Sequence, residues 1–137
     1  MKKPFIFDSI RKANNFAVSF VEKELQKFKL GTLKFSHYEI IRLLHIHKRM
    51  QLKDIASNII KHKSTVTALI YKLEKLDYIV STQSTKDKRK SFISLSEKGK
   101  TLKSFINSIE QKLLIHLHHK ITPQDQSQIA TQLNKLT

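Results

Sequence analysis

Residues 86 to 90 of the chain carry four positive charges, on Lys86, Lys88, Arg89 and Lys90. Cationic side chains at this density suit the phosphates of a nucleic acid, which attract them without regard to base sequence. A run of like charges is also typical of a solvated loop. The function of this basic stretch therefore depends on the elements that position it.

A second group of polar side chains precedes this stretch. From Ser64 onward the apolar residues recur with helical spacing, which predicts a buried face and an opposite, exposed face. The exposed face presents Thr65, Ala68, Tyr71, Lys72 and Lys75. Hydroxyl groups can bind phosphates or base edges, and lysines bind phosphates, so this face is a second candidate for contact with a nucleic acid.

The seven histidines of the chain raise the question of a metal site. His116 and His119 are three residues apart on a predicted helix, a spacing that can chelate a metal ion. No cysteine accompanies them and nearby carboxylates are few, whereas zinc sites usually combine such ligands. We therefore predict no metal and no other cofactor.

The composition indicates one ordinary globular domain without an enzyme motif. The 137 residues are 39% hydrophobic and 27% charged, and this length fits a single domain. The sequence contains no glycine-rich phosphate loop, nucleophile elbow, paired-carboxylate motif or zinc-protease helix, so we expect no enzymatic activity. No signal peptide or membrane-length apolar run is recognisable, and we expect a cytoplasmic protein.

The net charge of +15 favours a polyanionic partner such as DNA, RNA or an anionic membrane surface. The excess is concentrated in residues 48–103, which hold 14 Lys or Arg and five Asp or Glu. A membrane surface is disfavoured because the basic residues gather around the polar stretch and not along one amphipathic helix. A merely solvating surplus of lysine remains an alternative, since net charge does not specify a partner.

Hydrophobic periodicity predicts a mainly α fold (α+β) with the element order α-α-α-α-β-β-α-α. Helical spacing covers about 5–29, 36–47, 52–60 and 64–76, and later a long segment from Ser96 and a short one from Thr122. The period falls to about two at 78–80 and again at 92–95, which indicates two strands on either side of the basic stretch.

Capping residues predict where several helices begin and end. Gly31 is expected to end the first helix, and Ser36 to cap the second with Glu39 at the reciprocal position. Ser96 and Thr122 are expected to cap the last two helices, and proline follows Thr122 at the first helical position.

Two short helices followed by a hairpin with a basic tip form a winged helix-turn-helix. In this arrangement the second helix enters the major groove of DNA, and the hairpin reaches the neighbouring minor groove or the backbone. We expect one domain over 1–137, with the DNA-binding part at 36–97 and long dimerisation helices at 1–30 and 98–137.

The terminal helices carry more apolar surface than a small winged helix can cover. Phe5, Phe7, Phe16 and Phe20 belong to the stripe of the first helix. Exposed surface of this size indicates a partner, and we expect a homodimer. Packing of the terminal helices within one chain is the alternative.

The sequence also resembles the MarR family of bacterial transcriptional regulators over essentially its whole length. Leu52-Lys53-Asp54-Ile55-Ala56 and Lys63-Ser64-Thr65-Val66-Thr67 are similar to the helix-turn-helix of that family. Asp87-Lys88-Arg89 and Leu95-Ser96-Glu97-Lys98-Gly99-Lys100 resemble the Asp-x-Arg wing and the Leu-Thr-x-Lys-Gly opening of the next helix. The wing-to-helix motif is the more specific of the two.

The resemblance implies a homodimer that binds double-stranded DNA at a palindromic operator, usually as a repressor. It also implies a cleft for small aromatic or anionic effectors, which we expect His37 and His45 to line; polar surface or dimer contact is the simpler interpretation of both. Arg89 corresponds to the wing residue that enters the minor groove, where Asp87 would orient it. A simple turn acid is the alternative for Asp87.

The resemblance further places the DNA contacts on the predicted recognition helix and on the wing. On the helix they are Lys63, Ser64, Thr65, Thr67, Ala68 and Lys72, and on the wing Lys86, Asp87, Lys88, Arg89 and Lys90. Alternative functions are a metal-responsive regulator of the same fold, a winged-helix adaptor, or a non-specific nucleic-acid-binding protein.

The chain departs from the family pattern at positions that affect turns and base preference. The glycine of the helix-turn-helix turn is Ile60, and the glycine before the wing is Asp77. An arginine common on the recognition helix is Ala68, and an aspartate near its middle is Tyr71.

Overall fold

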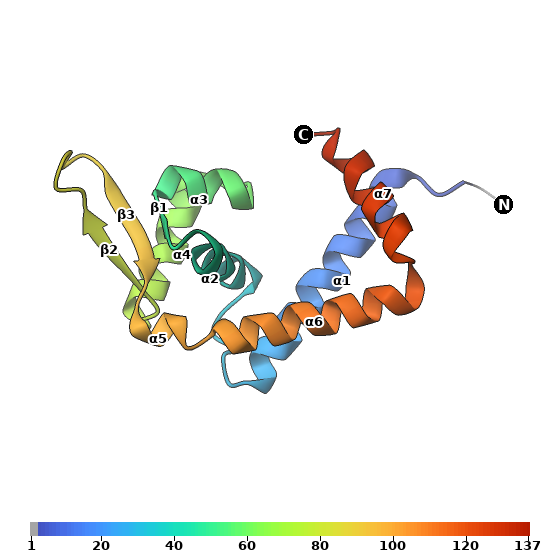
Figure 1. Cartoon of the computed structure of the whole chain (residues 1–137), viewed down its shortest axis with the longest axis horizontal. Helices are drawn as coiled ribbons and strands as arrows, with labels where there is room; N and C mark the ends of the chain where they lie inside the picture. The colour runs from blue at the N-terminus through green and yellow to red at the C-terminus, as the bar shows by residue number, and fades with distance from the viewer. Residues whose placement is uncertain (1–2) are drawn as a thin grey trace.

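The computed structural model in Figure 1 describes residues 3–137 and is mainly helical, with one small sheet. The helices are α1 (Ile6–Lys27), α2 (Phe35–His47), α3 (Leu52–Ile59), α4 (Lys63–Lys75), α5 (Glu97–Lys100), α6 (Lys103–Lys120) and α7 (Pro123–Asn134). The strands are β1 (Arg49–Met50), β2 (Ile79–Gln83) and β3 (Ser91–Leu95). The predicted winged-helix class is confirmed. Residues 1 and 2 of the predicted first dimerisation segment lie outside the described residues.

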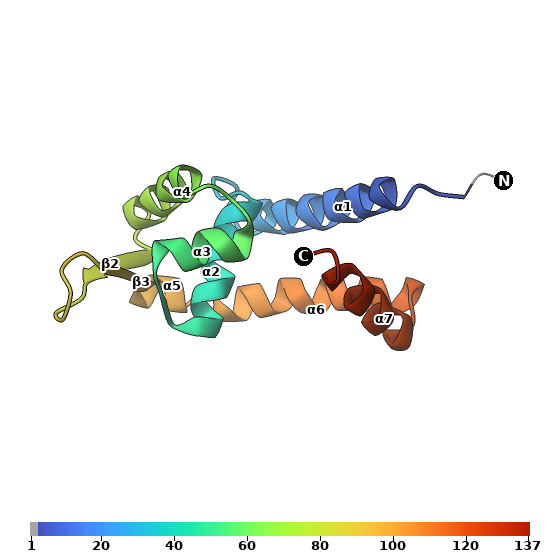
Figure 2. The same cartoon turned by 90° about the horizontal axis from the view of Figure 1, so that it is seen from above.

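The molecule is elongated, with two groups of elements at its ends. Helices α2, α3 and α4 and the sheet lie together at one end, and β2 and β3 project from it as the wing (Figure 1). Helix α1 crosses α6 in the view of Figure 1, and α7 turns back from the far end of α6 (Figure 2). No helix among residues 3–137 is long and apolar enough to span a bilayer.

Helix α2 joins the two groups, because its apolar side chains face the core on several sides. Ile40, Ile41 and Leu44 are each at most 2% exposed. The buried side chains around them come from α1, α3, α4, β2, β3 and α6; those less than 3% exposed are Val21, Leu25, Ile55, Val66, Leu73, Ile79 and Ile109. The helices predicted from apolar spacing at 36–47, 52–60 and 64–76 therefore each bury an apolar face.

A buried carboxylate links α1 to α6. Glu24 is 3% exposed and accepts hydrogen bonds from Lys112 at 2.8 Å and from Lys27 at 3.0 Å. These two ammonium groups, Lys112 first, hold the pKa of Glu24 below its ordinary value against the opposing effect of burial. A buried ion pair of this kind adds little net stability to the fold, but it constrains how α1 and α6 are positioned relative to each other.

Two predicted helix ends were wrong. Helix α1 ends at Lys27, and the left-handed residue after it is Lys29, with φ 61°, and not Gly31. Helix α2 begins at Phe35 with Lys34 as its N-cap, so Ser36 lies inside the first turn. The cap acceptor is His37 Nδ1, which accepts the Lys34 backbone N–H at 2.9 Å, and an α1 carboxylate, Glu22, accepts the Phe35 N–H at 3.0 Å. These acceptors replace the hydroxyl that the sequence suggested.

The sheet has a third strand that the predicted element order lacked. Its order is β1-β3-β2, all antiparallel, with Met50 opposite Ile93 and Ile79 opposite Leu95. Strand β1 has two residues, too few for an alternating pattern to be visible in the sequence. The guanidinium of Arg49 lies 3.8 Å from the centre of the Phe92 ring, which anchors β1 on β3.

The predicted helix after the wing is divided into α5 and α6. Ser96 caps as expected, since its Oγ accepts the Gly99 N–H at 3.0 Å, but α5 ends at Lys100 and α6 begins at Lys103. Gly99 lies so close to Tyr78, the residue before β2, that an added Cβ would be 2.1 Å from the Tyr78 carbonyl oxygen. The predicted Thr122 cap of α7 is confirmed, with its Oγ1 accepting the Asp125 N–H at 3.2 Å.

Candidate nucleic-acid interface and ligand cavities

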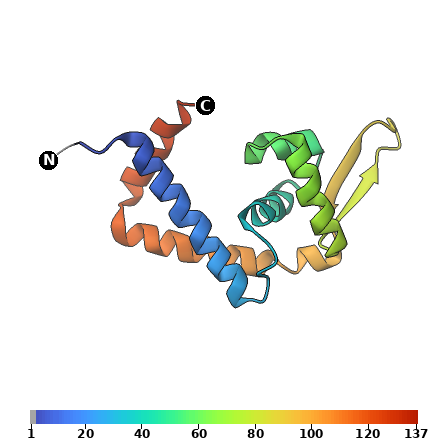
Figure 3. The same ribbon diagram turned by 180° about the vertical axis from the view of Figure 1, so that it is seen from behind.

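The outer face of α4 is uncovered, as Figure 3 shows from behind. Val66, Ile70 and Leu73 bury the opposite side of the helix in the core. This packing leaves Lys63, Ser64, Thr65, Thr67 and Ala68 exposed, as a recognition helix requires. Those five predicted contacts therefore share a solvent-facing side of α4, where the ammonium and hydroxyl groups among them can reach phosphates or base edges.

Two of the predicted contacts on α4 are already engaged within the chain. The Thr67 hydroxyl donates to the Lys63 carbonyl one turn earlier, at 2.8 Å. Lys72 is half-buried, and its ammonium donates to the backbone carbonyl of Thr32 between α1 and α2. Lys72 thus ties α4 to that loop and is less available to DNA than Lys63.

Tyr71 and Lys75 extend the exposed face of α4 beyond the predicted contact residues. Tyr71 is 59% exposed, and the ammonium of Lys75 lies 4.9 Å from the centre of its ring. The helical spacing places both on the outer face, so their position was predictable, while their mutual contact was not. An aromatic ring beside a cation here can contact the sugar–phosphate backbone.

The wing places a guanidinium at the tip of the hairpin. Arg89 Nε donates to Asp87 Oδ1 at 3.2 Å, and the Arg89 backbone N–H donates to the same oxygen at 3.0 Å. The side chain of Arg89 is 91% exposed, whereas that of Asp87 is 32% exposed. Asp87 thus closes the turn and also holds the base of the guanidinium. Lys86, Lys88 and Lys90 are exposed around this pair.

The base of the wing is fastened to the C-terminal end of α4. Lys98 Nζ donates to the Leu76 carbonyl at 2.9 Å, and its ammonium lies 4.7 Å from the centre of the Tyr78 ring. The Ser96 hydroxyl donates to the Asp77 carbonyl at 2.5 Å. Lys98 and Ser96 thus couple the wing to helix α4. Their place in the wing-to-helix motif was the available sequence signal.

Two residues, Ile60 and Asp77, replace glycines of the family pattern, and both have left-handed backbone. Ile60, between α3 and α4, has φ 55° and ψ 56°, and Asp77 has φ 65°. This conformation is costly for a β-branched residue, whereas aspartate tolerates it better. Ile60 gains little burial in return, since it is 83% exposed.

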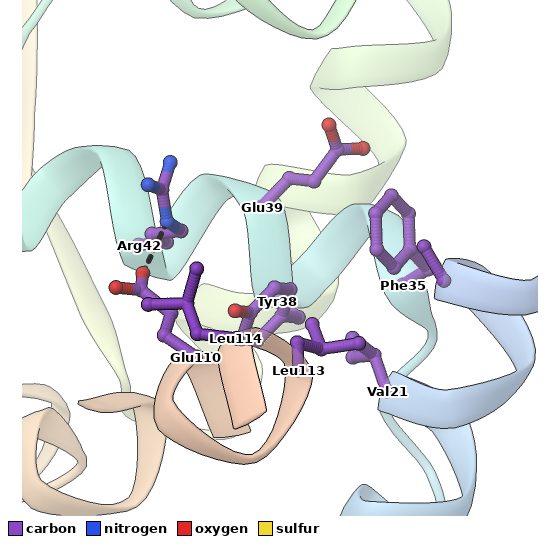
Figure 4. A pocket seen from close by; sticks show the side chains of 9 residues that line it. Val21, Phe35, Tyr38, Glu39, Arg42, Glu110, Leu113 and Leu114 are labelled. Atoms are coloured by element: carbon purple, nitrogen blue, oxygen red, sulfur yellow. Dashed lines mark hydrogen bonds and ion pairs between the residues drawn. The ribbon is translucent and has the colours of Figure 1, made fainter. Parts of the chain in front are cut away.

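A cavity of about 400 Å³ opens between α1, α2 and α6 (Figure 4). It is lined by Ala17, Val21, Phe35, Tyr38, Glu39, Arg42, Glu110, Leu113 and Leu114. Arg42 Nε donates to Glu110 Oε1 across one side of it. Burial raises the pKa of Tyr38 to about 12 and, to a smaller extent, the pKa of Glu39 above its ordinary value.

The two histidines predicted to line an effector cleft are not part of the cavity in Figure 4, and one of them lines another cavity. His37 is 4% exposed and caps α2, outside the lining of the cavity in Figure 4. Burial, followed by the charge of Lys72, lowers the pKa of His37 to about 4 and keeps the ring neutral, as its acceptor role requires. His45 lines a different cavity, next to the start of α6.

The C-terminal histidines make local contacts instead of a common site. His116 stacks on Phe16 of α1 with 4.7 Å between ring centres, and His118 Nδ1 lies 3.0 Å from Gln126 Nε2 of α7. In the part of the chain that the structure describes, no three His, Asp or Glu side chains converge on a point where a metal ion could bind.

Comparison with known proteins decides the family. The MarR family model matches residues 33–91, from just before α2 to the first residue of β3. The regulator SarZ of Staphylococcus aureus is 31% identical over 93 residues, which are 68% of this chain and 63% of SarZ. The chain belongs to the MarR family. Its match spans less than two thirds of SarZ.

Solved structures of similar fold superpose on nearly the whole chain. FabT of Streptococcus pneumoniae, solved in complex with DNA, has a TM-score of 0.78 and 15% identity, covering 96% of this chain and 92% of its own. NadR, solved in complex with 4-hydroxyphenylacetate, has a TM-score of 0.81 and 18% identity, covering 99% and 94%. At these identities the likeness establishes the fold. SarZ is a transcriptional regulator and not an enzyme, which agrees with the expectation of no enzymatic activity.

The MarR chain leaves a large apolar surface exposed on α1, α6, α7 and the residues before α1. Phe5, Ile6 and Phe7 at the N-terminal end are between 56% and 62% exposed. Further exposed members are Phe16, Leu114, Ile115, Ile129 and Leu136. Isolated apolar residues are normal on a surface, but this many large apolar side chains exposed on the terminal segments favour an interaction site.

Proposed function

We propose that this protein is a cytoplasmic transcriptional repressor that binds a palindromic site in double-stranded DNA as a homodimer. The observation that carries the proposal is the rigid pairing of two exposed cationic elements, the outer face of α4 and the Arg89 tip. Lys98 and Ser96 fasten the wing to the end of α4, so both elements approach DNA as one unit.

On DNA, α4 would lie in the major groove with Ser64, Thr65 and Ala68 toward the bases. Arg89 would enter the adjacent minor groove, where a narrow groove attracts a guanidinium. Lys63 and the wing lysines would contact phosphates, which position the protein without specifying sequence. FabT, which shares this fold, was solved in complex with DNA, which supports DNA binding by a chain of this fold.

The homodimer would be formed by α1, α6 and α7, which carry the exposed apolar surface. Ile115 on α6, 56% exposed, and Ile129 on α7, 47% exposed, would be covered by the second copy. Two-fold symmetry would then present two α4 helices to half-sites about 34–36 Å apart, one turn of DNA. A palindromic site matches that symmetry.

The cavity between α1, α2 and α6 would hold an effector. Its apolar and aromatic lining suits an aromatic body, and NadR, of the same fold, was solved with an aromatic acid. In this chain, however, Glu39 and Glu110 outnumber the single guanidinium of Arg42. A neutral or cationic aromatic ligand therefore fits this cavity better than an anion. Its binding would alter DNA affinity by favouring one spacing of the two α4 helices.

The experiment is a binding assay on duplex DNA from upstream of the protein's own gene. Arg89→Ala should weaken binding to this DNA by about tenfold or more, whereas Lys29→Ala, at an exposed lysine after α1, should leave it within about twofold. Equal losses in the two variants would count against the role of the wing. Weak, salt-insensitive binding by the wild type would instead favour a winged-helix adaptor.

A further inference from the structure

The outer face of α4, uncovered in Figure 3, lacks the side chains that most often read bases through paired hydrogen bonds. The helix, Lys63–Lys75, contains no Arg, Asn or Gln. Arginine reads guanine, and asparagine or glutamine reads adenine, because each can form two hydrogen bonds with one base edge. On the neighbouring helix α3, the amide of Asn58 donates to the Asp54 carbonyl at 2.8 Å. Base recognition by α4 must therefore rest on other groups.

Lysine can also bind guanine, but two of the three lysines of α4 are engaged within the chain. Lys72 donates to the Thr32 carbonyl. The Lys75 ammonium lies 4.9 Å from the centre of the Tyr71 ring. The third lysine, Lys63, is the first residue of the helix. Recognition of guanine by lysine is thus confined to the N-terminal end of α4.

A row of side chains with apolar surface runs along the middle of the same face. Thr65, Ala68 and Tyr71 follow one another at intervals of three residues, and all three are exposed. Residues three apart are neighbours on the surface of a helix, so two methyl-bearing side chains and a ring lie in succession. The row extends about 9 Å along the helix, close to the rise of about three base pairs.

Both departures of α4 from the family pattern lie in this row. Ala68 occupies the position of an arginine, and Tyr71 occupies the position of an aspartate. Each replacement removes a charge and leaves apolar surface on the face that would enter the major groove. The row therefore suits an apolar feature of the bases and not a charged or hydrogen-bonding one.

We propose that this row reads thymine methyl groups, so that the recognised duplex carries thymines where Ala68 and Tyr71 face the major groove. The C5-methyl group of thymine is the apolar feature that base pairs present in this groove, and apolar side chains contact it. Ala68 would cover one methyl group, and the Tyr71 ring would cover a neighbouring one. This inference rests on the proposed DNA-binding function and names the bases that α4 selects.

The wing would favour the same kind of duplex. Runs of A·T pairs have a narrow minor groove, which attracts a guanidinium. Arg89, whose side chain is 91% exposed at the tip of the wing, would enter such a groove beside the thymines. Two separate elements would therefore select A·T pairs, α4 by contact with methyl groups and the wing by the width of the groove.

The test compares duplexes from upstream of the gene that are prepared with thymine or with uracil. Uracil keeps the hydrogen-bonding groups of thymine and lacks only its methyl group. Each buried methyl group contributes about fourfold to affinity, so uracil throughout the duplex should weaken binding by about tenfold or more. Random duplexes of equal length, prepared both ways, measure any effect of uracil that does not depend on sequence. Equal affinity for the two upstream duplexes would overturn the proposal.

Substitutions of Tyr71 separate contact with methyl groups from contact with the DNA backbone. Tyr71→Ala removes the ring and should reduce the preference for thymine over uracil by about fourfold, whereas Tyr71→Phe keeps the ring and should retain that preference. Tyr71 is 59% exposed, so neither change disturbs the core. If the hydroxyl instead binds a phosphate, both variants would bind more weakly and keep the full preference for thymine. That result would overturn the proposal.

The matched control is Lys63→Gln, at a proposed phosphate contact on the same helix. It should weaken binding to the thymine and uracil duplexes by the same factor. A loss of thymine preference in this control as large as in Tyr71→Ala would overturn the role of the ring.

The same measurements separate this inference from the function on which it rests. If the wild type binds the upstream thymine duplex no more tightly than random DNA, the proposed function fails and this inference fails with it. If the wild type prefers the upstream duplex but binds its thymine and uracil forms alike, this inference fails alone.

Discussion

Ile60→Gly should stabilise the protein, although glycine is usually the more costly residue in a folded chain. Left-handed backbone costs an L residue about 1–2 kcal/mol, with β-branched residues at the upper end. Glycine removes that cost and loses about 0.5–1 kcal/mol through the greater freedom of the unfolded chain. Because Ile60 is 83% exposed, the burial lost with its side chain is only a few tenths of a kcal/mol. The net expectation is about 1 kcal/mol of added stability.

The control is Ile46→Gly, the same substitution on helix α2. Ile46 is 54% exposed and lies in the last turn of the helix, one residue before its end, where glycine still costs about 0.5 kcal/mol in backbone entropy, the lower end of the range for a helix interior. The two variants should therefore shift the free energy of unfolding in opposite directions. Ile60→Asn should also stabilise, since asparagine tolerates left-handed backbone.

Urea unfolding followed by circular dichroism measures these differences in the free energy of unfolding. All variants are compared at one protein concentration, because the stability of the proposed dimer would depend on concentration. We expect the thermal midpoint of Ile60→Gly to rise by about 2–6 °C. If Ile60→Gly destabilises the protein as much as Ile46→Gly does, the assignment of strain to Ile60 is wrong.

Three further substitutions test other contacts. Gly99→Ala should destabilise by about 1–3 kcal/mol or more in urea unfolding, because its Cβ would meet the Tyr78 carbonyl; unchanged stability would refute this close contact. His37→Gln should flatten the fall in stability between pH 6.5 and pH 4: the folded pKa of His37 is lowered to about 4, so its contribution is complete above pH 6.5 and lost as the pH falls, while glutamine keeps a capping acceptor. Unfolding curves at several pH values measure this slope, and an identical slope in the variant would contradict it. Ile115→Glu should shift sedimentation toward the monomer, whereas Ile46→Glu, with similar exposure, should not; equal sedimentation would count against α6 in the interface.

The long apolar stripes and the change of period made the fold predictable from the sequence. The buried faces of α3 and α4 follow spacings such as Ile55, Ala56 and Ile59, which only a helix brings together. Strand β1 was not predictable, because two residues carry no period and its pairing with β3 depends on distant residues. The α2 cap was wrong because a hydroxyl at Ser36 is a local signal, whereas the actual acceptors include Glu22 from α1.

The candidate site was predictable in part for the same reason. Exposure of Thr65 and Arg89 follows from helical spacing and from the hairpin tip. The engagement of Lys72 with Thr32, and the cavity at His45, depend on which loops and helices meet in space. Hydrophobic periodicity predicts the buried and exposed faces of one element, but it does not predict contacts between different elements. Ile60 has left-handed backbone and occupies a position where the family pattern has glycine. The replacement of that glycine by isoleucine was therefore a usable sequence signal of backbone strain.

The central claim is that α4 and the wing read a specific duplex as a pair. The most direct test is a salt titration of the affinity for the upstream DNA and for random duplex DNA of equal length. We expect a steep fall in affinity with salt for both, and tighter binding to the upstream DNA by at least about a thousandfold at physiological salt. Equal affinity for the two duplexes at every salt concentration would contradict sequence-specific recognition by this chain.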